Sequence, residues 1–179
     1  MQIGFGGFPE INFGLNLNLS YNNFALTTVW QGASRFNINV GGLYRNPFDN
    51  ENVPLDLHTK YSWTQDPINP GVGNNPNAQL PAFDIDGSRP WNNVNSDFWL
   101  KDGTYLRLRT AQLAYNIPQA LAKKLWTRNI KFYVAGENLL TFSRLGIFDA
   151  TLDPEQASNI GTFGLPVLRS FTLGVMIGI

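Results

Sequence analysis

The strongest constraint on this chain is the stretch from Ile11 to Tyr21, in which apolar residues occupy every second position. Successive side chains of a β-strand point to opposite faces, so a strand here would have one apolar and one polar face. The apolar positions are Ile11, Phe13, Leu15, Leu17, Leu19 and Tyr21. Because a membrane-spanning strand needs about 9–11 residues, the stretch fits either such a strand or the half-buried strand of a soluble sheet.

Four later stretches also favour strands. The Asn-Asn pair after Tyr21 predicts a tight turn into a second strand at residues 24–31. Alternation resumes from Arg35 to Tyr44, and the pattern leaves open whether this extends the second strand or begins a separate hairpin. Further strands are predicted at residues 104–115, 130–142 and 168–179.

The segment from Ser96 to Pro118 combines a turn signal with a long strand. Its Asp102-Gly103 pair predicts a tight turn in which Gly103 takes a positive φ. Pro118 ends the strand because proline has no N–H to donate to a ladder.

Two arginines interrupt the apolar side of that strand. Strict alternation would place Arg107 and Arg109 on the same face as Tyr115. Either a β-bulge near Thr110 shifts the phase of the strand, or the arginines lie beyond the apolar belt of a membrane, where charge costs little.

The connections between the predicted strands alternate in length. Residues 45–95 are rich in Pro, Asn, Gly and Asp without a sustained apolar period, and residues 148–166 form a second long loop. The first turn and residues 119–129 are short, and Leu121 and Leu125 predict one or two helical turns in the latter. Short periplasmic turns and long outer loops are typical of outer-membrane barrels, so the pattern predicts a barrel with a periplasmic C-terminus.

Composition excludes several function classes. The formal net charge is 0 and 15% of the residues are charged, which does not indicate binding to nucleic acid. There is no Cys, so disulfides and thiolate metal sites are excluded. The sequence has no run of about 18 apolar residues, so no transmembrane helix is predicted. No secretory signal is visible at the start. His58, the single His, is predicted to lie on a loop surface rather than in a metal site or nucleophile relay.

Several motifs follow one another along the chain in a fixed order. They are FPEINFGLNLNLSYNNFAL (Phe8–Leu26), Trp30-Gln31-Gly32, SDFWLKDGTYLRLRTAQLAYNIP (Ser96–Pro118), FYVAGENLLTFS (Phe132–Ser143), the loop from Gly146 to Asp149, and RSFTLGVMIGI (Arg169–Ile179). In this order the chain resembles, over nearly its whole length, the C-terminal end of the SusC/RagA family of TonB-dependent outer-membrane transporters.

The resemblance implies an all-β fold. The family forms an antiparallel transmembrane β-barrel of roughly 22 strands with a plugged lumen, and this chain would be about the last five strands. Residues 1–179 would be the C-terminal part of the barrel domain, without the plug domain and earlier strands, and Met1 would be an internal or misassigned start. Ile179 stands where members end on an aromatic residue read by the assembly machinery, which puts the efficiency of assembly in doubt.

The resemblance also implies a function. The intact protein would import oligosaccharides, or oligopeptides, across the outer membrane of a Gram-negative bacterium. A SusD-like lipoprotein would be its partner, and the TonB-ExbB-ExbD system would energise it through the missing N-terminal part. No catalytic residue, cofactor or metal is expected. The alternative is a soluble extracellular glycan-binding β-sandwich; an enzyme acting on glycans would need two placed carboxylates, and no such pair stands out.

Candidate ligand contacts lie in or beside the long loop. Aromatic rings can stack on sugars, and charged or amide groups can bond their hydroxyls. The alternative is that these residues pack the loop onto the barrel rim or contact the lipoprotein. The candidates are Trp63, Trp91, Asp84, Asp86 and Arg89. The pair of aspartates resembles part of a calcium loop but lacks the later acidic ligand, so turn chemistry explains it better.

Membrane placement predicts two further sets. The aromatic girdle beside the apolar belt would contain Tyr21, Phe98, Trp99 and Tyr115. Glu137 would be costly against lipid, so it is predicted to face the lumen with Lys131 and Tyr133 and to contact the plug.

Overall fold

The computed structural model describes residues 4–48, 53–69, 71–83, 90–155 and 167–178. The chain divides into two compact units. The sheet unit comprises Pro9–Ser34, Thr104–Ser143 and Val167–Ile179. The loop unit comprises Met1–Phe8, Arg35–Gly103 and Arg144–Pro166.

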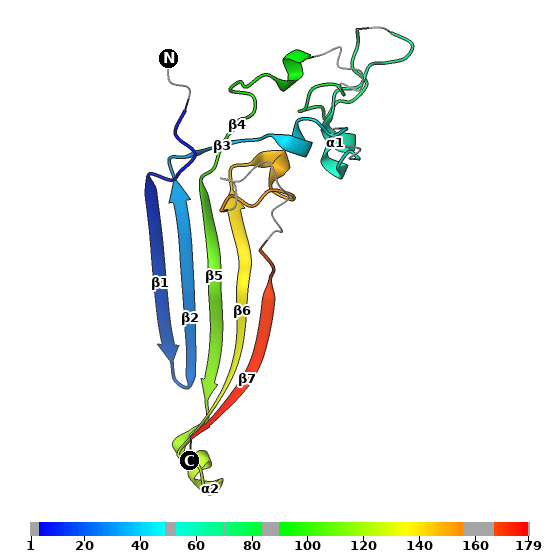
Figure 1. Cartoon of the computed structure of the whole chain (residues 1–179). Coiled ribbons are helices and arrows are strands. Elements are labelled where there is room, and N and C mark those ends of the chain that lie inside the picture. Colours follow the sequence, from blue (N-terminus) through cyan, green and yellow to red (C-terminus); the bar gives the residue numbers. More distant parts are fainter. Residues whose placement is uncertain (1–3, 49–52, 70, 84–89, 156–166, 179) are drawn as a thin grey trace. The chain divides into compact units, whose positions relative to one another are not determined.

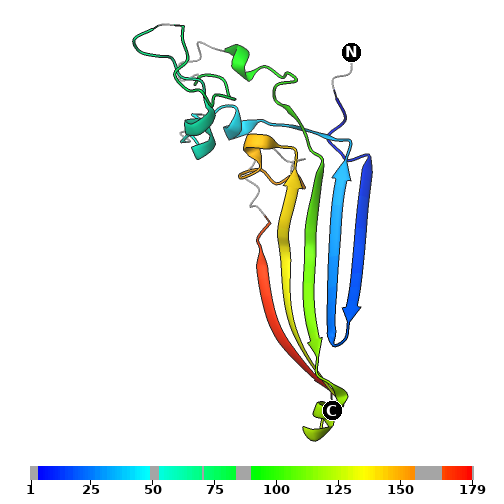
Figure 2. The ribbon, with the colours of Figure 1, turned by 180° about the vertical axis from the view of Figure 1, so that it is seen from behind.

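The sheet unit is a single antiparallel sheet of five strands in the order β1-β2-β5-β6-β7 (Figures 1 and 2). Each strand therefore pairs with its neighbours in the unit, and β1 and β7 form the two edges. The strands are β1 (Ile11–Tyr21), β2 (Phe24–Ser34), β5 (Tyr105–Asn116), β6 (Asn129–Ser143) and β7 (Ser170–Gly178). The five predicted strands are thus confirmed, with ends that differ by a few residues.

The register gives the sheet one continuous apolar face. Directly opposite residues of antiparallel strands share a face, and one such row crosses all five strands. It consists of Leu19, Leu26, Leu113, Val134 and Leu173. All five side chains are exposed. In the described residues this apolar face has no second layer over it, as a β-sandwich would require.

A β-bulge separates the arginines of β5 from its apolar face. Val29 pairs with Thr110 and Trp30 with Leu108, so Arg109 is the additional residue of β5 opposite β2. Leu108 pairs with Trp30 on the apolar face, and Arg107 pairs with Gln31 on the polar face. The predicted bulge near Thr110 is confirmed, and it corrects the placement that strict alternation gave to Arg107.

The loop unit contains a small sheet and short helices. Asn37–Asn39 (β3) pairs with Leu100–Asp102 (β4), so the alternating stretch after Arg35 begins a separate pairing and does not extend β2. The helices are η1 (Gly42–Tyr44), α1 (Asp56–Tyr61), η3 (Pro90–Asn93) and η4 (Gly146–Phe148). The buried apolar core of this unit includes Phe36, Ile38, Val40, Leu57, Leu80, Trp99, Leu145 and Phe148.

Gly103 has a different role from the one predicted. It is absent from the residues with positive φ, so the expected tight turn with a left-handed glycine is wrong. Its N–H donates to the carbonyl of Phe36 at 3.0 Å, and a Cβ on Gly103 would collide with the Phe36 ring. The glycine therefore permits close packing beneath an aromatic ring.

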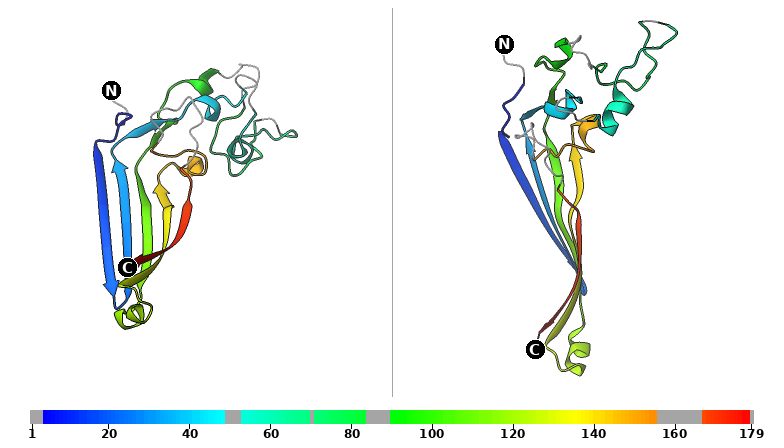
Figure 3. Two further views of the ribbon diagram at one scale, coloured as in Figure 1. Left: turned by 60° about the horizontal axis from the view of Figure 1, so that its bottom comes forward. Right: turned by 45° about the vertical axis from the view of Figure 1, so that its right-hand side comes forward.

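The two short connections of the sheet unit are a turn and a short helix. Asn22 takes a left-handed φ of 50° in the turn between β1 and β2, which asparagine tolerates. The predicted helical turns after Pro118 are confirmed as α2 (Gln119–Lys124), between β5 and β6 (Figure 3). Among the described residues, no helix has the length and apolar character needed to cross a membrane.

We expect Gly32→Ala to destabilise the sheet. A Cβ there would collide with the Phe13 ring and lie 2.6 Å from the backbone oxygen of Tyr105, which cannot move without disturbing the pairing of β2 with β5. Overpacking of this kind costs about 1–3 kcal/mol. Heat-dependent gel mobility of the intact protein measures it. Gly14→Ala is the matched control, because its Cβ would only approach the Trp30 oxygen at 3.4 Å; equal mobility of both variants would contradict the prediction.

Candidate functional site

The bulge gathers a polar cluster on the sheet. Arg109 Nε donates to Gln31 Oε1 at 2.9 Å, and its Nη1 donates to Asn138 Oδ1 at 3.3 Å. Asn138 takes a left-handed φ of 52° where β6 passes the bulge. One guanidinium thus joins side chains of β2, β5 and β6. We call Gln31, Arg107, Arg109, Asn138 and Thr141 the polar strip.

Arg107 is the buried member of the polar strip. Its Nε donates to Thr141 Oγ1 at 2.9 Å, and its guanidinium carbon lies 5.8 Å from the centre of the Tyr105 ring. A buried guanidinium requires hydrogen-bond partners because its desolvation is costly. Thr141 therefore has a structural task in holding Arg107 against the sheet.

The three residues predicted to face the lumen share the polar side of β6. Glu137 pairs with Ser170, whose Oγ donates to Glu137 Oε2 at 3.1 Å. Tyr133 lies across Gly174, where a Cβ would collide with its ring, and Lys131 pairs with Met176 on the same face. The predicted contact of these residues with a plug stays a prediction.

An aromatic row crosses the sheet near its two short connections. Tyr21 pairs with Phe24, Phe24 with Tyr115, and Tyr115 with Phe132. The rings of Phe24 and Tyr115 have their centres 4.8 Å apart. Beside this row an apolar depression of about 520 Å³ is lined by Leu113, Val134, Leu173 and Val175. Tyr21 and Tyr115 are predicted girdle residues, and strand register adds Phe24 and Phe132 to the same row; that the row forms a membrane girdle stays a prediction.

The other two predicted girdle residues belong to the loop unit. Trp99 is buried, and its Nε1 donates to the Asn92 oxygen at 2.8 Å. Phe98 is exposed and meets the Trp99 ring edge to face, with centres 4.9 Å apart. This packing accounts for Trp99 inside the loop unit, and the girdle role of both residues remains a prediction.

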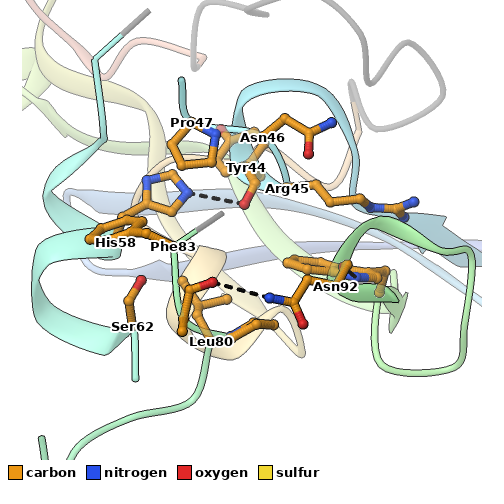
Figure 4. Close-up of a pocket in the computed structure, with 12 residues that line it drawn as sticks. Tyr44, Arg45, Asn46, Pro47, His58, Ser62, Leu80, Phe83 and Asn92 are labelled. Atoms are coloured by element: carbon orange, nitrogen blue, oxygen red, sulfur yellow. Dashed lines mark hydrogen bonds between the residues drawn. The ribbon is translucent and has the colours of Figure 1, made fainter. Parts of the chain in front are cut away.

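A small cavity lies inside the loop unit (Figure 4). Its volume is about 30 Å³, which holds roughly one or two waters and no sugar or peptide unit. It is lined by residues that include Tyr44, Arg45, His58, Ser62, Asn92 and Trp99. The cavity is therefore part of the packing of the loops.

His58 is a packing residue and not a surface residue. It is only 3% exposed, so the predicted surface position is wrong. Its Nδ1 accepts from the Leu55 N–H at 3.0 Å, and its Nε2 lies 3.0 Å from the Tyr44 oxygen, as Figure 4 shows. The tautomer with hydrogen on Nε2 satisfies both bonds. The ring thus ties the start of α1 to the last residue of η1.

Two cations support the same unit and were not predicted. Arg45 donates to Asn95 Oδ1 and to the Val40 oxygen, both at 2.8 Å, and stacks over the Trp99 ring. Burial lowers the pKa of Arg45 and that of Lys101. The Lys101 ammonium lies 4.8 Å from the centre of the Phe98 ring. No local sequence signal identifies Asn95 and Trp99 as partners of Arg45, because Asn95 is 50 residues away in the sequence and Trp99 lies beyond it.

The predicted ligand contacts do not form one described site. Trp63 is half-buried over Gly73, and Trp91 is 82% exposed in η3. Asp84, Asp86 and Arg89 lie outside the described residues. In the described part of the chain, no group of three or more His, Asp or Glu side chains could hold a metal ion. The ligand-contact predictions therefore remain untested by this geometry.

Two curated relatives match most of the chain. TonB-dependent receptor P3 of Formosa agariphila is 29% identical over 177 residues, covering 93% of this chain and 16% of the relative. TonB-dependent receptor P26 of the same organism is 27% identical over 185 residues, covering 93% and 17%. The chain thus spans about one sixth of the length of these relatives. No family model matches the chain.

Solved structures show the same fold. The RagAB peptide importer in its 'open-open' state is 20% identical, with a TM-score of 0.64, and the match covers 99% of this chain and 18% of that chain. The 'closed-closed' state of RagAB gives a TM-score of 0.66 at 20% identity, covering 98% and 18%. The predicted fold, an antiparallel section of a β-barrel, is confirmed.

We expect Thr141→Val to destabilise the sheet. The change keeps the shape of the side chain but removes the hydroxyl that accepts from buried Arg107. Loss of one partner from a buried polar group costs about 1–3 kcal/mol. Urea unfolding of the intact protein in detergent measures the change. Thr172→Val is the matched control, since Thr172 is exposed on the same face; an equal effect of both variants would argue against a structural role for Thr141.

We expect His58→Ala to loosen the loop unit. The Leu55 N–H and the Tyr44 oxygen would lose their shared partner, at a cost of about 1–3 kcal/mol for each buried group left unpaired. Limited digestion with trypsin at Lys60, in the adjacent helix, should become faster. The control is Thr59→Ala, an exposed neighbour. Unchanged cleavage in the His58 variant would sink the prediction.

Proposed function

We propose that the chain is a member of the SusC/RagA family of TonB-dependent receptors and part of an outer-membrane importer of oligomeric nutrients. The observation that carries the proposal is the sheet itself. Its apolar face is exposed from β1 to β7, and its other face carries the polar strip and Glu137. Lipid outside and a polar lumen inside would suit these two faces.

We assign residues 1–179 to the C-terminal part of the barrel domain. The strands would cross the outer membrane. The C-terminus would lie on the periplasmic side, because β7 finishes at the same end of the strands as α2 and the turn after Tyr21. In this orientation the long loops would be extracellular. Matches over 177 and 185 residues, which span only about one sixth of two longer relatives, support the assignment to part of a larger protein.

The proposed partners are a SusD-like lipoprotein outside and the TonB-ExbB-ExbD system inside. The likeness to RagAB, named a peptide importer, supports a transport function, and the partners follow from the proposed family. For the substrate we propose oligosaccharides first, because Trp63 and exposed Trp91 lie in the loop unit and can stack on sugar rings. Oligopeptides are the second candidate, supported by the RagAB likeness. No catalytic role is proposed.

Growth and uptake tests examine this function. Deletion of the gene in its own host should abolish growth on one class of oligomer, glycan or peptide, and leave growth on the monomers intact. Trp63→Ala and Trp91→Ala should then weaken uptake of an oligosaccharide roughly 2- to 10-fold, the loss expected for one aromatic contact.

The matched control is Ile68→Ala, another exposed apolar side chain of the loop unit. Normal uptake by both tryptophan variants would contradict ligand contact by these residues. Normal growth of the deletion strain on every oligomer would contradict the importer. A protein that stays monomeric in water without detergent would favour the soluble glycan-binding sandwich instead.

A further inference from the structure

The connection between β5 and β6 exposes an unusual set of side chains. Trp126 is 94% exposed, and two leucines in and beside α2 are exposed as well. Three exposed basic residues lie among these apolar residues in the sequence. No acidic residue occurs from Thr110 to Gly136. We call this set the turn cluster: Leu121, Lys123, Lys124, Leu125, Trp126 and Arg128.

Packing places the turn cluster beside the apolar face of the sheet. Ile130 continues the apolar side of β6 beyond Phe132, yet it is 8% exposed whereas Phe132 is 46% exposed. α2 contacts β6, and Ala122 is fully buried. The Ile117 N–H donates to the Ile130 oxygen at 2.8 Å, which closes the connection against the strand ends. Ala122 is therefore the inward-facing residue of α2, while Leu121 and Leu125 at its C-cap point outward.

The exposed chemistry fits the surface of a phospholipid layer. Tryptophan collects at membrane interfaces, where its ring meets acyl chains and its N–H meets headgroups. Basic side chains near an anionic leaflet each contribute about 1 kcal/mol. In water alone, two leucines and a tryptophan on one short connection would form a costly apolar patch.

We propose that the turn cluster is an anchor in the phospholipid headgroups at the α2 end of the sheet. Its three apolar members lie at the boundary between headgroups and acyl chains, and its three basic members bind the phosphates of anionic lipids. The aromatic row of Tyr21, Phe24, Tyr115 and Phe132 lies next to it on the same apolar face. The anchor rests on the proposed membrane location of the sheet.

Spin labels on single cysteines test the anchor in the intact protein. This chain has no Cys, so once any cysteine elsewhere in the intact protein is replaced by serine, Leu121→Cys, Leu17→Cys and Ser20→Cys each provide a single label. Leu17 marks the apolar face and Ser20 the polar face of β1. The protein is reconstituted in vesicles of phosphatidylcholine, with or without phosphatidylglycerol, and depth is read from access to oxygen and to a water-soluble nickel reagent.

We expect the Leu121 label about 5–10 Å inside the headgroup boundary, the Leu17 label in lipid and the Ser20 label in water. Phosphatidylglycerol should draw the Leu121 label deeper. The triple variant Lys123→Gln, Lys124→Gln, Arg128→Gln should lose that response, and Lys60→Gln, an exposed lysine of the loop unit, should keep it.

The failures are distinguishable. A Leu121 label in water, with the Leu17 label in lipid, would overturn the anchor and leave the barrel intact. A Leu121 label at the boundary that ignores phosphatidylglycerol would overturn the binding of anionic headgroups. A Leu17 label in water would overturn both the anchor and the membrane location.

Discussion

The bulge at Arg109 determines how the side chains of one half of β5 are phased relative to those of the other half. Side chains alternate with a period of two, so deletion of this one residue would move half of the strand to the opposite face. With the bulge, Leu108 joins Trp30 and Leu140 in an apolar row. At the bulge, the guanidinium of Arg109 donates hydrogen bonds to Gln31 of β2 and Asn138 of β6 and so links the three strands. The separation of apolar and polar faces on β5 thus depends on one additional residue, and β6 accommodates it with two residues, Asn138 and Leu139, opposite Arg109.

The strands could be predicted from the sequence because they follow from alternation, whereas the roles of individual loop residues could not, because they depend on distant contacts. The strands and the need for a bulge follow from period-two patterns, which survive in the structure almost unchanged. Gly103 and His58 were misjudged because their roles come from Phe36 and Tyr44, residues far away in the sequence. A polar loop hides such contacts, since a buried histidine with two backbone partners has the same local sequence as an exposed one.

The formal charge of zero conceals a strong segregation between the two units. The loop unit holds eleven of the 13 acidic residues and six of the 13 basic residues, a formal net charge of −5. The sheet unit holds the remaining two acidic and seven basic residues, a formal net charge of +5. Composition alone could not show this. A loop surface of that sign repels polyanionic ligands, most strongly at low ionic strength.

The edges of the sheet restrict what can cover its apolar face. A second sheet packed on that face would shield it, but β1 and β7 would still present unpaired backbone groups at the edges. Further strands that close a barrel would pair both edges, and lipid would then cover the apolar face without any second layer. A closed barrel in lipid thus provides both pairing for the edge strands and cover for the apolar face, whereas a sandwich provides only the cover. The exposed apolar face and the two long edge strands of the described sheet therefore both favour closure into a barrel over a sandwich.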